Sequence, residues 1–376
     1  MSKSEIVGRS YEADKRLLKK ILRQKAAARR KTGPMSMGQI SLFLAYLEQS
    51  DGHAYNIHFS FKIKSVIRFQ TLEDAFQQLV DRHEILRTTY GFEDDMTVQT
   101  VHGHMDAVLG SVDLAGLPEN RINERLKTDA RHPFDLFQGP VIRACLYSKG
   151  GEEHSFLLTL HHIAGDGRSL FVLVKELLAS YRQLCMGKGG SLPSMPRSQY
   201  LDFVLWEQEL LGGPRGKVLE AFWDKALEGP LPLLNLPLSP VTMEDPGSNS
   251  ISLELGNELA DRIRALVRET GIGFYTVAFS AFTVLLHHYS DQEEILVGMP
   301  TSTQLSLSSA RVDPDVAGYL VNPVVIRSRI KEAYLCYLND LEDRISGALD
   351  HQAYPFYKIN EKKTRERRTG NHRFST

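Results

Sequence analysis

Two hydrophobic periods alternate irregularly along this chain, and this alternation most limits the fold that it can adopt. Residues 56–64 (NIHFSFKIK) alternate polar and apolar side chains, which is typical of a strand. From Thr71, which with Asp74 resembles a capping box, apolar residues recur at helical spacing, and residues 155–160 (SFLLTL) favour a buried strand. The second half repeats the mixture, with helices expected over 258–269, 275–288 and 334–349, and strands over 252–255, 295–299 and 321–327. We therefore expect an α/β (α+β) protein of two lobes whose sheets are mixed rather than purely parallel.

The charge balance and hydropathy exclude two classes of partner. Lys and Arg number 45 against 46 Asp and Glu, so the chain has no positive excess to drive nucleic-acid binding. The longest nearly apolar run, 274–286, is interrupted by polar residues and is shorter than the ~20 residues that cross a bilayer. We expect neither a nucleic acid nor a membrane as partner.

Cysteine usage indicates a reducing compartment. Cys145, Cys185 and Cys336 are odd in number, far apart and without a CxxC pair, so neither a disulfide framework nor a structural zinc site is predicted. Residues 1–14 lack the apolar segment of a secretory signal. These features together predict a cytoplasmic protein whose cysteines are core or surface thiols.

Two stretches of biased composition divide the chain. Residues 15–31 hold nine Lys and Arg and no acid, with apolar side chains at helical spacing, and Gly33-Pro34 follows. Residues 1–33 are thus predicted to be a basic linker helix, which is either simply solvated or a contact for an acidic neighbour. The Gly/Pro/Ser stretch 187–197 predicts a boundary between an N-terminal lobe, 34–190, and a C-terminal lobe, 191–376.

The strongest chemical pattern is HHIAGDG, residues 161–167, between a predicted strand and a predicted helix. Adjacent side chains of an extended chain point to opposite faces, so one histidine faces inward and the other is free to enter a cleft. Gly165 and Gly167 predict a tight turn with positive φ that folds the Asp166 carboxylate back toward the strand end. A base held by an orienting acid suits acyl transfer. The alternatives are a structural histidine or a metal site, and the diverging rings disfavour a metal.

Other polar residues have weaker signals. Arg82 and Arg87 follow a predicted helix, and they either pair with a buried carboxylate such as Asp166 or are solvated cations at the helix end. His102 and His104 flank Gly103 and predict a turn at the surface.

These residues resemble the condensation domains of non-ribosomal peptide synthetases and hybrid polyketide synthase assembly lines. The resemblance runs from about Pro34 to about Ile359 and includes six motifs in the family's order. They are MSMGQISLF (35–43), RHEILRT (82–88), HHIAGDGRS (161–169), YLDFVLW (200–206), AGYLVNP (317–323) and HQAYPF (351–356). Gln304 and Pro323 depart from the family's usual Arg and Thr, and the sequence ends soon after the sixth motif, so the family's last strands are expected to be absent.

The resemblance implies two chloramphenicol-acetyltransferase-like lobes in a V-shaped pseudo-dimer. A tunnel between the lobes would admit two phosphopantetheine arms, which belong to upstream and downstream carrier proteins, and the domain itself would bind no cofactor. His162 matches the catalytic histidine, Asp166 an orienting or structural position, and Gly167 a position whose N–H faces the developing oxyanion. Site-shaping or structural positions match His161, Arg82, Arg87, Trp206 and Asn322.

The function that the resemblance implies is condensation of a carrier-bound acyl thioester with an amine in natural-product biosynthesis. The neighbours would be carrier proteins and adjoining megasynthase domains. An ester-forming or chain-releasing acyltransferase with a hydroxyl acceptor is an alternative, and so is an epimerase relative, which shares the HHxxxDG motif. A non-catalytic recruitment or gatekeeping domain is the alternative from another class.

Overall fold

The chain forms two compact units. The computed structural model describes residues 29–48, 52–187, 196–237, 251–309, 312–313 and 315–369. The first unit comprises the chain up to Leu210 together with Gln304–Val321, and the second comprises Leu211–Thr303 and Asn322–Thr376. The expected lobe boundary near residue 190, and most of the expected basic helix, lie outside the described residues.

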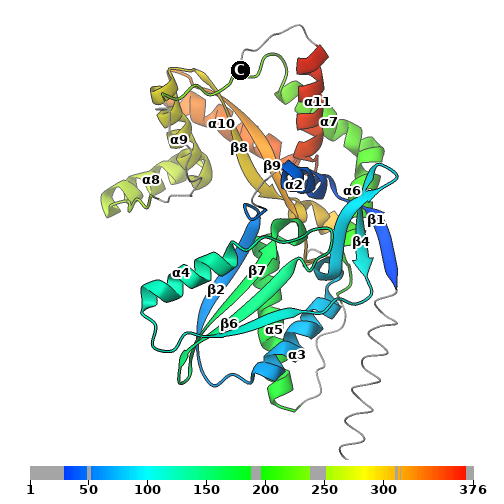
Figure 1. Cartoon of the computed structure of the whole chain (residues 1–376). Helices are drawn as coiled ribbons and strands as arrows, with labels where there is room; N and C mark the ends of the chain where they lie inside the picture. The colour runs from blue at the N-terminus through cyan, green and yellow to red at the C-terminus, as the bar shows by residue number, and fades with distance from the viewer. Residues whose placement is uncertain are drawn as a thin grey trace, which may run out of the picture. The chain divides into compact units, whose positions relative to one another are not determined.

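A mixed four-stranded sheet is the centre of the first unit (Figure 1). Its order is β2 (Asn56–Lys64), β7 (Glu153–His161), β6 (Ile142–Gly150) and β5 (Val108–Asp113). β7 is antiparallel to both of its neighbours, β2 and β6, whereas β5 runs parallel to β6, so the sheet is mixed as predicted.

Both faces of this sheet are covered, which explains the apolar run that predicts β7. Phe156 and Leu158 belong to the main core, whereas Leu157 packs on the opposite face with Tyr147 and with Ile122 of α4 (Glu119–Ala130). Since every β7 residue from His154 to His161 is buried, apolar side chains are required at successive positions rather than at alternate ones.

Helices α3 (Phe69–Arg82) and α5 (Gly167–Cys185) pack against each other beside the sheet. The α3 residues predicted to share an apolar face are buried. The helix begins two residues before Thr71, and Arg68 at its N-cap makes no side-chain capping bond, so the capping-box prediction is wrong. The apolar face of α3, rather than a polar cap, specifies this helix.

A second sheet of the first unit consists of β1 (Arg30–Pro34), β4 (Met96–His102) and β3 (Thr88–Glu93), with β4 in the middle. The expected basic helix is wrong at its end, because Arg30 and Lys31 lie in β1 and pair with His102 and Val101. The first unit also contains α2 (Met37–Glu48), α6 (Tyr200–Gly212), which runs into the second unit, and short 3-10 helices at Glu84–Arg87 (η1), His162–Ala164 (η2) and Thr303–Ser309 (η3).

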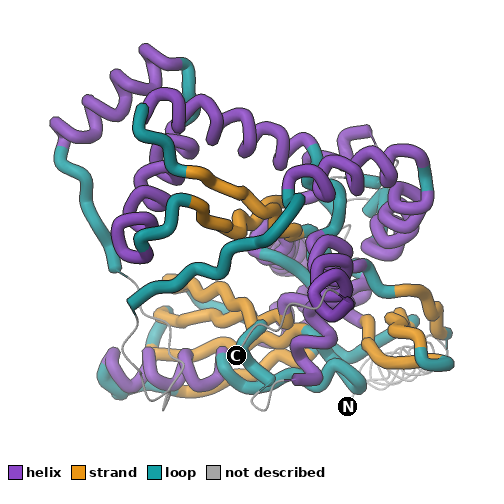
Figure 2. Tube along the Cα trace, turned by 90° about the horizontal axis from the view of Figure 1, so that it is seen from above, coloured by secondary structure: helices purple, strands orange, loops and turns teal. Residues whose placement is uncertain are grey.

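The second unit has a two-stranded sheet with helices around it, seen from above in Figure 2. Its strands are β8 (Glu294–Ser302) and β9 (Val321–Arg329), and its helices are α7 (Pro214–Ala226), α8 (Asn257–Thr270), α9 (Phe274–Ser290), α10 (Tyr334–Asp350) and α11 (Phe356–Thr369). The predicted helices and the two later strands are confirmed, whereas the expected strand over 252–255 is wrong because those residues take no regular structure.

No single helix of the described chain is long and apolar enough to cross a membrane. Helices α8 and α9 reach that length and composition only as a pair, and they meet at a bend of 114°. The three cysteines are free thiols.

Candidate active site

The two histidines at the end of β7 face different surroundings, as the strand alternation predicts. The His161 side chain is buried, its Nδ1 accepts the Ile163 N–H at 3.2 Å, and the rings of Tyr46 and Phe134 lie edge-on to it. Burial, with a smaller effect of the neighbouring His162, lowers the pKa of His161 to about 4. His161 is therefore neutral and holds the strand end.

His162 is half-buried and begins the short helix η2. Its backbone N–H donates to the Tyr55 carbonyl at 2.8 Å, and its Nδ1 lies 2.8 Å from the Gly165 carbonyl oxygen. A carbonyl oxygen only accepts, so in the neutral imidazole Nδ1 carries the proton and Nε2 keeps a lone pair. This is the tautomer in which an imidazole can take a proton from a nucleophile.

The turn after His162 needs glycine for space and not for positive φ, so that part of the prediction is wrong. Gly165 is extended, with φ of 175°, and Gly167 is the first residue of α5. A Cβ on Gly165 would lie 2.6 Å from a Leu160 methyl group and 2.9 Å from the Ser169 Cβ. A Cβ on Gly167 would meet nothing within 4 Å, so packing of the described chain does not require that glycine.

Asp166 caps α5 instead of folding back on the histidine. Its Oδ1 accepts the Ser169 N–H at 2.8 Å and lies 2.9 Å from the Ser169 hydroxyl. Its Oδ2 accepts the Leu320 N–H at 3.4 Å. The expected orienting acid is therefore replaced by the Gly165 carbonyl, because the unpaired N–H groups at the start of a helix are strong partners for a carboxylate.

Tyr319 is the residue at this site that sequence reasoning missed. Its ring centroid lies 5.1 Å from that of His162, and the two planes meet at 89°. The Tyr319 side chain is half-buried, and burial, with smaller effects of Tyr55 and Asp166, raises its pKa to about 12. A signal for it exists in the sequence, because Tyr319 lies within the fifth motif, of which the site prediction uses only Asn322.

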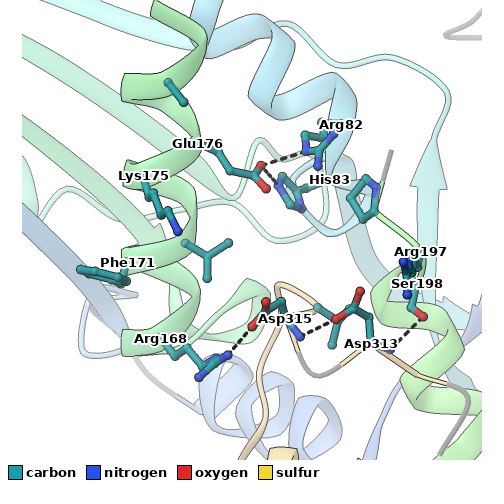
Figure 3. Close-up of a pocket in the computed structure, with 14 residues that line it drawn as sticks. Arg82, His83, Arg168, Phe171, Lys175, Glu176, Arg197, Ser198, Asp313 and Asp315 are labelled. Carbon is teal, nitrogen blue, oxygen red and sulfur yellow. Dashed lines mark hydrogen bonds and ion pairs between the residues drawn. The ribbon is translucent and has the colours of Figure 1, made fainter. Parts of the chain in front are cut away.

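Arg82 pairs with a carboxylate, but with that of Glu176 in α5 rather than Asp166 (Figure 3). Arg82 Nε donates to Glu176 Oε2 at 2.9 Å, and His83 Nε2 lies 2.7 Å from the same oxygen. Burial pushes the pKa of Glu176 up, yet the hydrogen bonds from His83 and Arg82 outweigh it and leave that pKa below its usual value. The three side chains line a cleft of about 530 Å³ beside α5.

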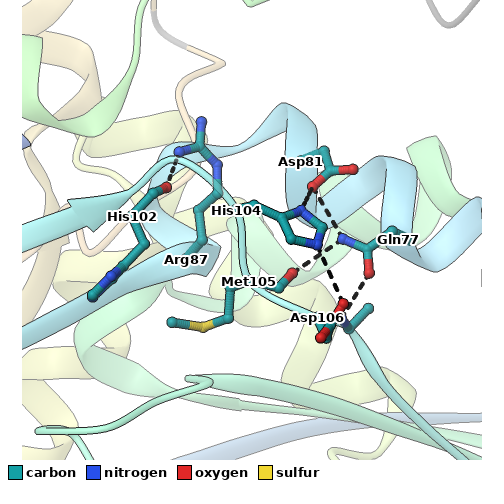
Figure 4. Close-up of polar contacts among 8 residues, drawn as sticks. Gln77, Asp81, Arg87, His102, His104, Met105 and Asp106 are labelled. Atoms are coloured by element: carbon teal, nitrogen blue, oxygen red, sulfur yellow. Dashed lines mark hydrogen bonds and ion pairs between the residues drawn. The ribbon is translucent and has the colours of Figure 1, made fainter. Parts of the chain in front are cut away.

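Arg87 is also buried, so neither arginine is the solvated cation of the alternative prediction. It donates to the His102 carbonyl (Figure 4). It also lies 3.9 Å from the Glu84 carboxylate. The His102 ring is hydrogen-bonded to the Thr89 hydroxyl. Burial, with smaller effects of the nearby Arg30 and Arg87, lowers the pKa of His102. These contacts hold the second sheet.

His102 and His104, the residues on either side of Gly103 that were expected to form a surface turn, are both half-buried. Figure 4 shows His104 between two carboxylates, with Nδ1 3.0 Å from Asp81 and Nε2 3.2 Å from Asp106. The His104 side chain is only 10% exposed. It fastens the loop before β5 to α3.

Trp206 and Asn322 have structural contacts in different units. The Trp206 ring packs on the Phe203 ring of α6, with 5.7 Å between the ring centroids, beside the core of the first unit. Asn322, in the second unit, donates to the carbonyls of Gln352 (2.8 Å) and Tyr354 (2.9 Å) and accepts the Phe356 N–H (2.8 Å). Asn322 therefore links the fifth and sixth motifs.

The described residues contain no group of three His, Cys, Asp or Glu placed to hold a metal ion.

The site consists of an oriented imidazole, a capped helix start and an uncrowded glycine. Residues 30–376 match the family model of the condensation domain. The chain belongs to the condensation domain family. The resemblance that the six motifs predict is confirmed.

The curated relatives that this condensation domain matches are synthases much longer than the chain. It is 30% identical over 333 residues to tyrocidine synthase 3 of Brevibacillus parabrevis, a match that covers 88% of this chain and 5% of that protein. It is also 30% identical over 345 residues to a plipastatin synthase of Bacillus subtilis (strain 168), covering 90% of this chain and 13% of the relative. The chain thus spans a small part of the length of these relatives.

Solved structures share the fold. The X-domain from teicoplanin biosynthesis matches with a TM-score of 0.79 at 23% identity, over 87% of this chain and 73% of that one. The first condensation domain of the calcium-dependent antibiotic synthetase matches with a TM-score of 0.71 at 19% identity, over 88% and 77%. The predicted chloramphenicol-acetyltransferase-like fold class is confirmed.

Proposed function

We propose that this condensation domain joins a carrier-bound acyl thioester to a carrier-bound amine and forms an amide. The observation that carries the proposal is the His162 imidazole, whose Nδ1 faces the Gly165 carbonyl and whose Nε2 is left to accept a proton. The exposed, uncrowded backbone at Gly167 supports it, because a thioester can approach there without meeting a side chain.

The reaction follows from these groups. The amine attacks the thioester carbonyl, and the negative charge moves to the carbonyl oxygen. Gly167 is the first residue of α5, where an N–H has no acceptor inside the helix and favours an anion. Collapse of the intermediate breaks the C–S bond, the amine proton passes to His162 Nε2, and the proton then neutralises the departing thiolate. Tethering of both substrates supplies proximity.

The partners belong to the same proposal. The acyl and amine groups arrive on phosphopantetheine arms of upstream and downstream carrier proteins, so the domain needs no cofactor of its own. The long synthetases to which the chain is similar support adjoining megasynthase domains as neighbours. The cytoplasmic location expected from the cysteines stays a prediction.

Two alternatives use the same fold. A hydroxyl acceptor would give an ester-forming or chain-releasing enzyme, and the His162 tautomer is compatible with it. A non-catalytic recruitment domain is the alternative outside catalysis, since the teicoplanin X-domain has been solved in complex with OxyB. A rate of product formation that depends on the imidazole separates catalysis from recruitment.

The test is intact-protein mass spectrometry of an acyl-loaded donor carrier and an aminoacyl-loaded acceptor carrier. The acceptor should gain the mass of the acyl group with the wild-type domain and with His58→Gln, a substitution of an exposed histidine in β2. His162→Ala should slow the gain. Product that forms as fast with His162→Ala as with the wild type, or that never forms with the wild type, would overturn the proposal.

A further inference from the structure

The orientation of the His162 ring depends on more than its own hydrogen bond. One bond from Nδ1 to the Gly165 carbonyl fixes the tautomer but allows the ring to tilt about that bond. The Tyr319 ring stands perpendicular to the imidazole at a centroid distance of 5.1 Å. Such an edge-to-face contact favours one ring plane.

Tyr319 is itself held on both sides of its backbone. Its carbonyl accepts the Tyr200 hydroxyl at 2.7 Å. The preceding residue, Gly318, donates its N–H to the Ser169 hydroxyl oxygen at 3.1 Å. The following residue, Leu320, donates its N–H to Asp166. The segment is therefore fastened to the first turn of α5, which closely follows His162 in the sequence.

Two glycines make room for this arrangement. A Cβ on Gly38 of α2 would lie 2.8 and 2.9 Å from two Tyr319 ring atoms. A Cβ on Gly318 would lie 1.8 Å from the Tyr200 ring. Both approaches are closer than a side chain permits, so these glycines let the tyrosines reach their places.

We infer that Tyr319 is a positioning residue, whose ring holds the plane of the His162 imidazole so that Nε2 faces the reacting groups. This inference rests on the function proposed above. It also gives Asp166 an indirect part, because the carboxylate docks the segment that carries Tyr319 and does not touch the imidazole.

Proton NMR of the protein labelled with [13Cε1]-histidine tests the contact without any substrate. The His162 resonance is assigned as the one that His162→Ala removes. Because an aromatic ring current shifts nearby protons, Tyr319→Leu should move the His162 resonance more than any other histidine resonance. Tyr319→Phe keeps the ring and should leave it in place. The other histidine resonances report that the variants are folded.

A second variant keeps the test decisive if Tyr319→Leu does not fold. Gly38→Ala should displace the Tyr319 ring and shift the His162 resonance while Tyr319 is retained. An unchanged His162 resonance in a folded Tyr319→Leu or Gly38→Ala protein would overturn the inference.

The carrier assay adds a kinetic readout. Tyr319→Leu should lower kcat by up to about 100-fold with little change in KM, since a small misplacement of the base costs rate rather than binding. Tyr319→Phe should retain kcat. If the wild type forms no product, the proposed function fails, whereas the NMR result still decides whether Tyr319 positions His162.

Discussion

His162 Nδ1 is hydrogen-bonded to the Gly165 carbonyl, so only Nε2 can act as a base. How much that base contributes to the rate depends on the acidity of the substrate group that accepts the acyl chain. An α-amine, with a pKa of about 7.7–8.0, is partly unprotonated near neutral pH, so it needs His162 only to accept a proton late or to position the nucleophile. A hydroxyl needs its proton removed during attack. We therefore expect His162→Ala to slow ester formation by about 10²- to 10⁴-fold and amide formation by less. Single-turnover rates with one donor and matched amine and hydroxyl acceptors measure this, and equal losses would contradict it.

Substitutions of Gly165 and Gly167 should have opposite effects, one on stability and the other on the condensation rate. Gly165→Ala forces a Cβ against Leu160 and Ser169 and should cost about 1–3 kcal/mol of the free energy of unfolding. Gly167→Ala meets no atom within 4 Å, so its stability should be equal or slightly higher, as alanine favours a helix. Its condensation rate should nevertheless fall, because the methyl group occupies the approach to the thioester.

Urea unfolding and the carrier assay on both variants check the pair. Full activity of Gly167→Ala would show that the open space at this residue is not used by the substrate. Unchanged stability of Gly165→Ala would show that the turn can relax around a side chain.

At the residue scale, the sequence predicts what local geometry dictates. The opposite orientations of His161 and His162 follow from strand alternation alone. The contacts of Asp166 with Leu320, of Arg82 with Glu176 and of Tyr319 with His162 do not, because each joins segments that are far apart in the chain. A carboxylate in a turn has several possible donors, and only tertiary packing decides among them.

At the scale of one element, the start of α2 depends on a buried acid. Glu207 of α6 accepts the Met37 N–H at 2.8 Å. Burial raises the pKa of Glu207 to about 7, although the bond from Met37 opposes the rise. The folded protein therefore binds a proton more tightly than the unfolded chain, and stability falls as pH rises from about 4.5 to 7.

Glu207→Gln keeps an acceptor for Met37 and removes the titration. Its free energy of unfolding should depend less on pH across that window, by at most about 3 kcal/mol. Urea unfolding of the wild type and the variant at pH 5 and pH 8 measures the difference. Parallel pH dependence of the two proteins would contradict the assignment to Glu207.

The link between α3 and α5 should respond to pH in the opposite direction. Glu176 has a lowered pKa because His83 and Arg82 donate to it, so its contribution is present above about pH 4.5 and is lost as pH falls. Glu176→Gln should cost about 1–3 kcal/mol at pH 7, with the gap closing in acid. Thermal unfolding at pH 7 and at about pH 2, below the lowered pKa of Glu176, tests this, and a gap that persists at the lower pH would exclude the charge as its cause.

Elements with a strong hydrophobic period were predicted closely, whereas their ends were not. The strand over 56–64 and the helices over 258–269 and 275–288 follow from the period of their apolar side chains, although β2 and α8 contain no fully buried residue. The capping-box prediction at Thr71 is wrong because burial of the apolar face of α3 stabilises the helix by more than one capping hydrogen bond would. The residues over 252–255 alternate like a strand but are exposed and have no sheet partner among the described residues.

At the scale of the whole molecule, the chain enters the first unit twice. Residues 304–321 belong to that unit, and Val316, Ala317 and Leu320 lie in its core. Composition does not mark this return, since the segment is no richer in Gly and Pro than an ordinary loop. The Gly/Pro/Ser stretch 187–197 is the stronger compositional signal for a boundary, because composition indicates where a chain turns and not which unit a segment packs on.

Asn322 is where the chain leaves the first unit, and it makes three hydrogen bonds with the segment of the sixth motif. Asn322→Ala leaves two carbonyls and one N–H without these partners and should cost about 2–4 kcal/mol. Because the contacts lie inside the second unit, amide hydrogen exchange should accelerate at 352–356 and along β9. The first unit, with α5 and the His162 turn, should keep its protection.

The matched control is Asn339→Ala, which removes an exposed asparagine of α10 that bonds to the Leu335 carbonyl four residues earlier. It should leave exchange in β9 unchanged. Faster exchange in the first unit of Asn322→Ala would mean that the two units unfold as one cooperative body. Confinement to the second unit would mean that the site around His162 is stabilised by its own unit alone.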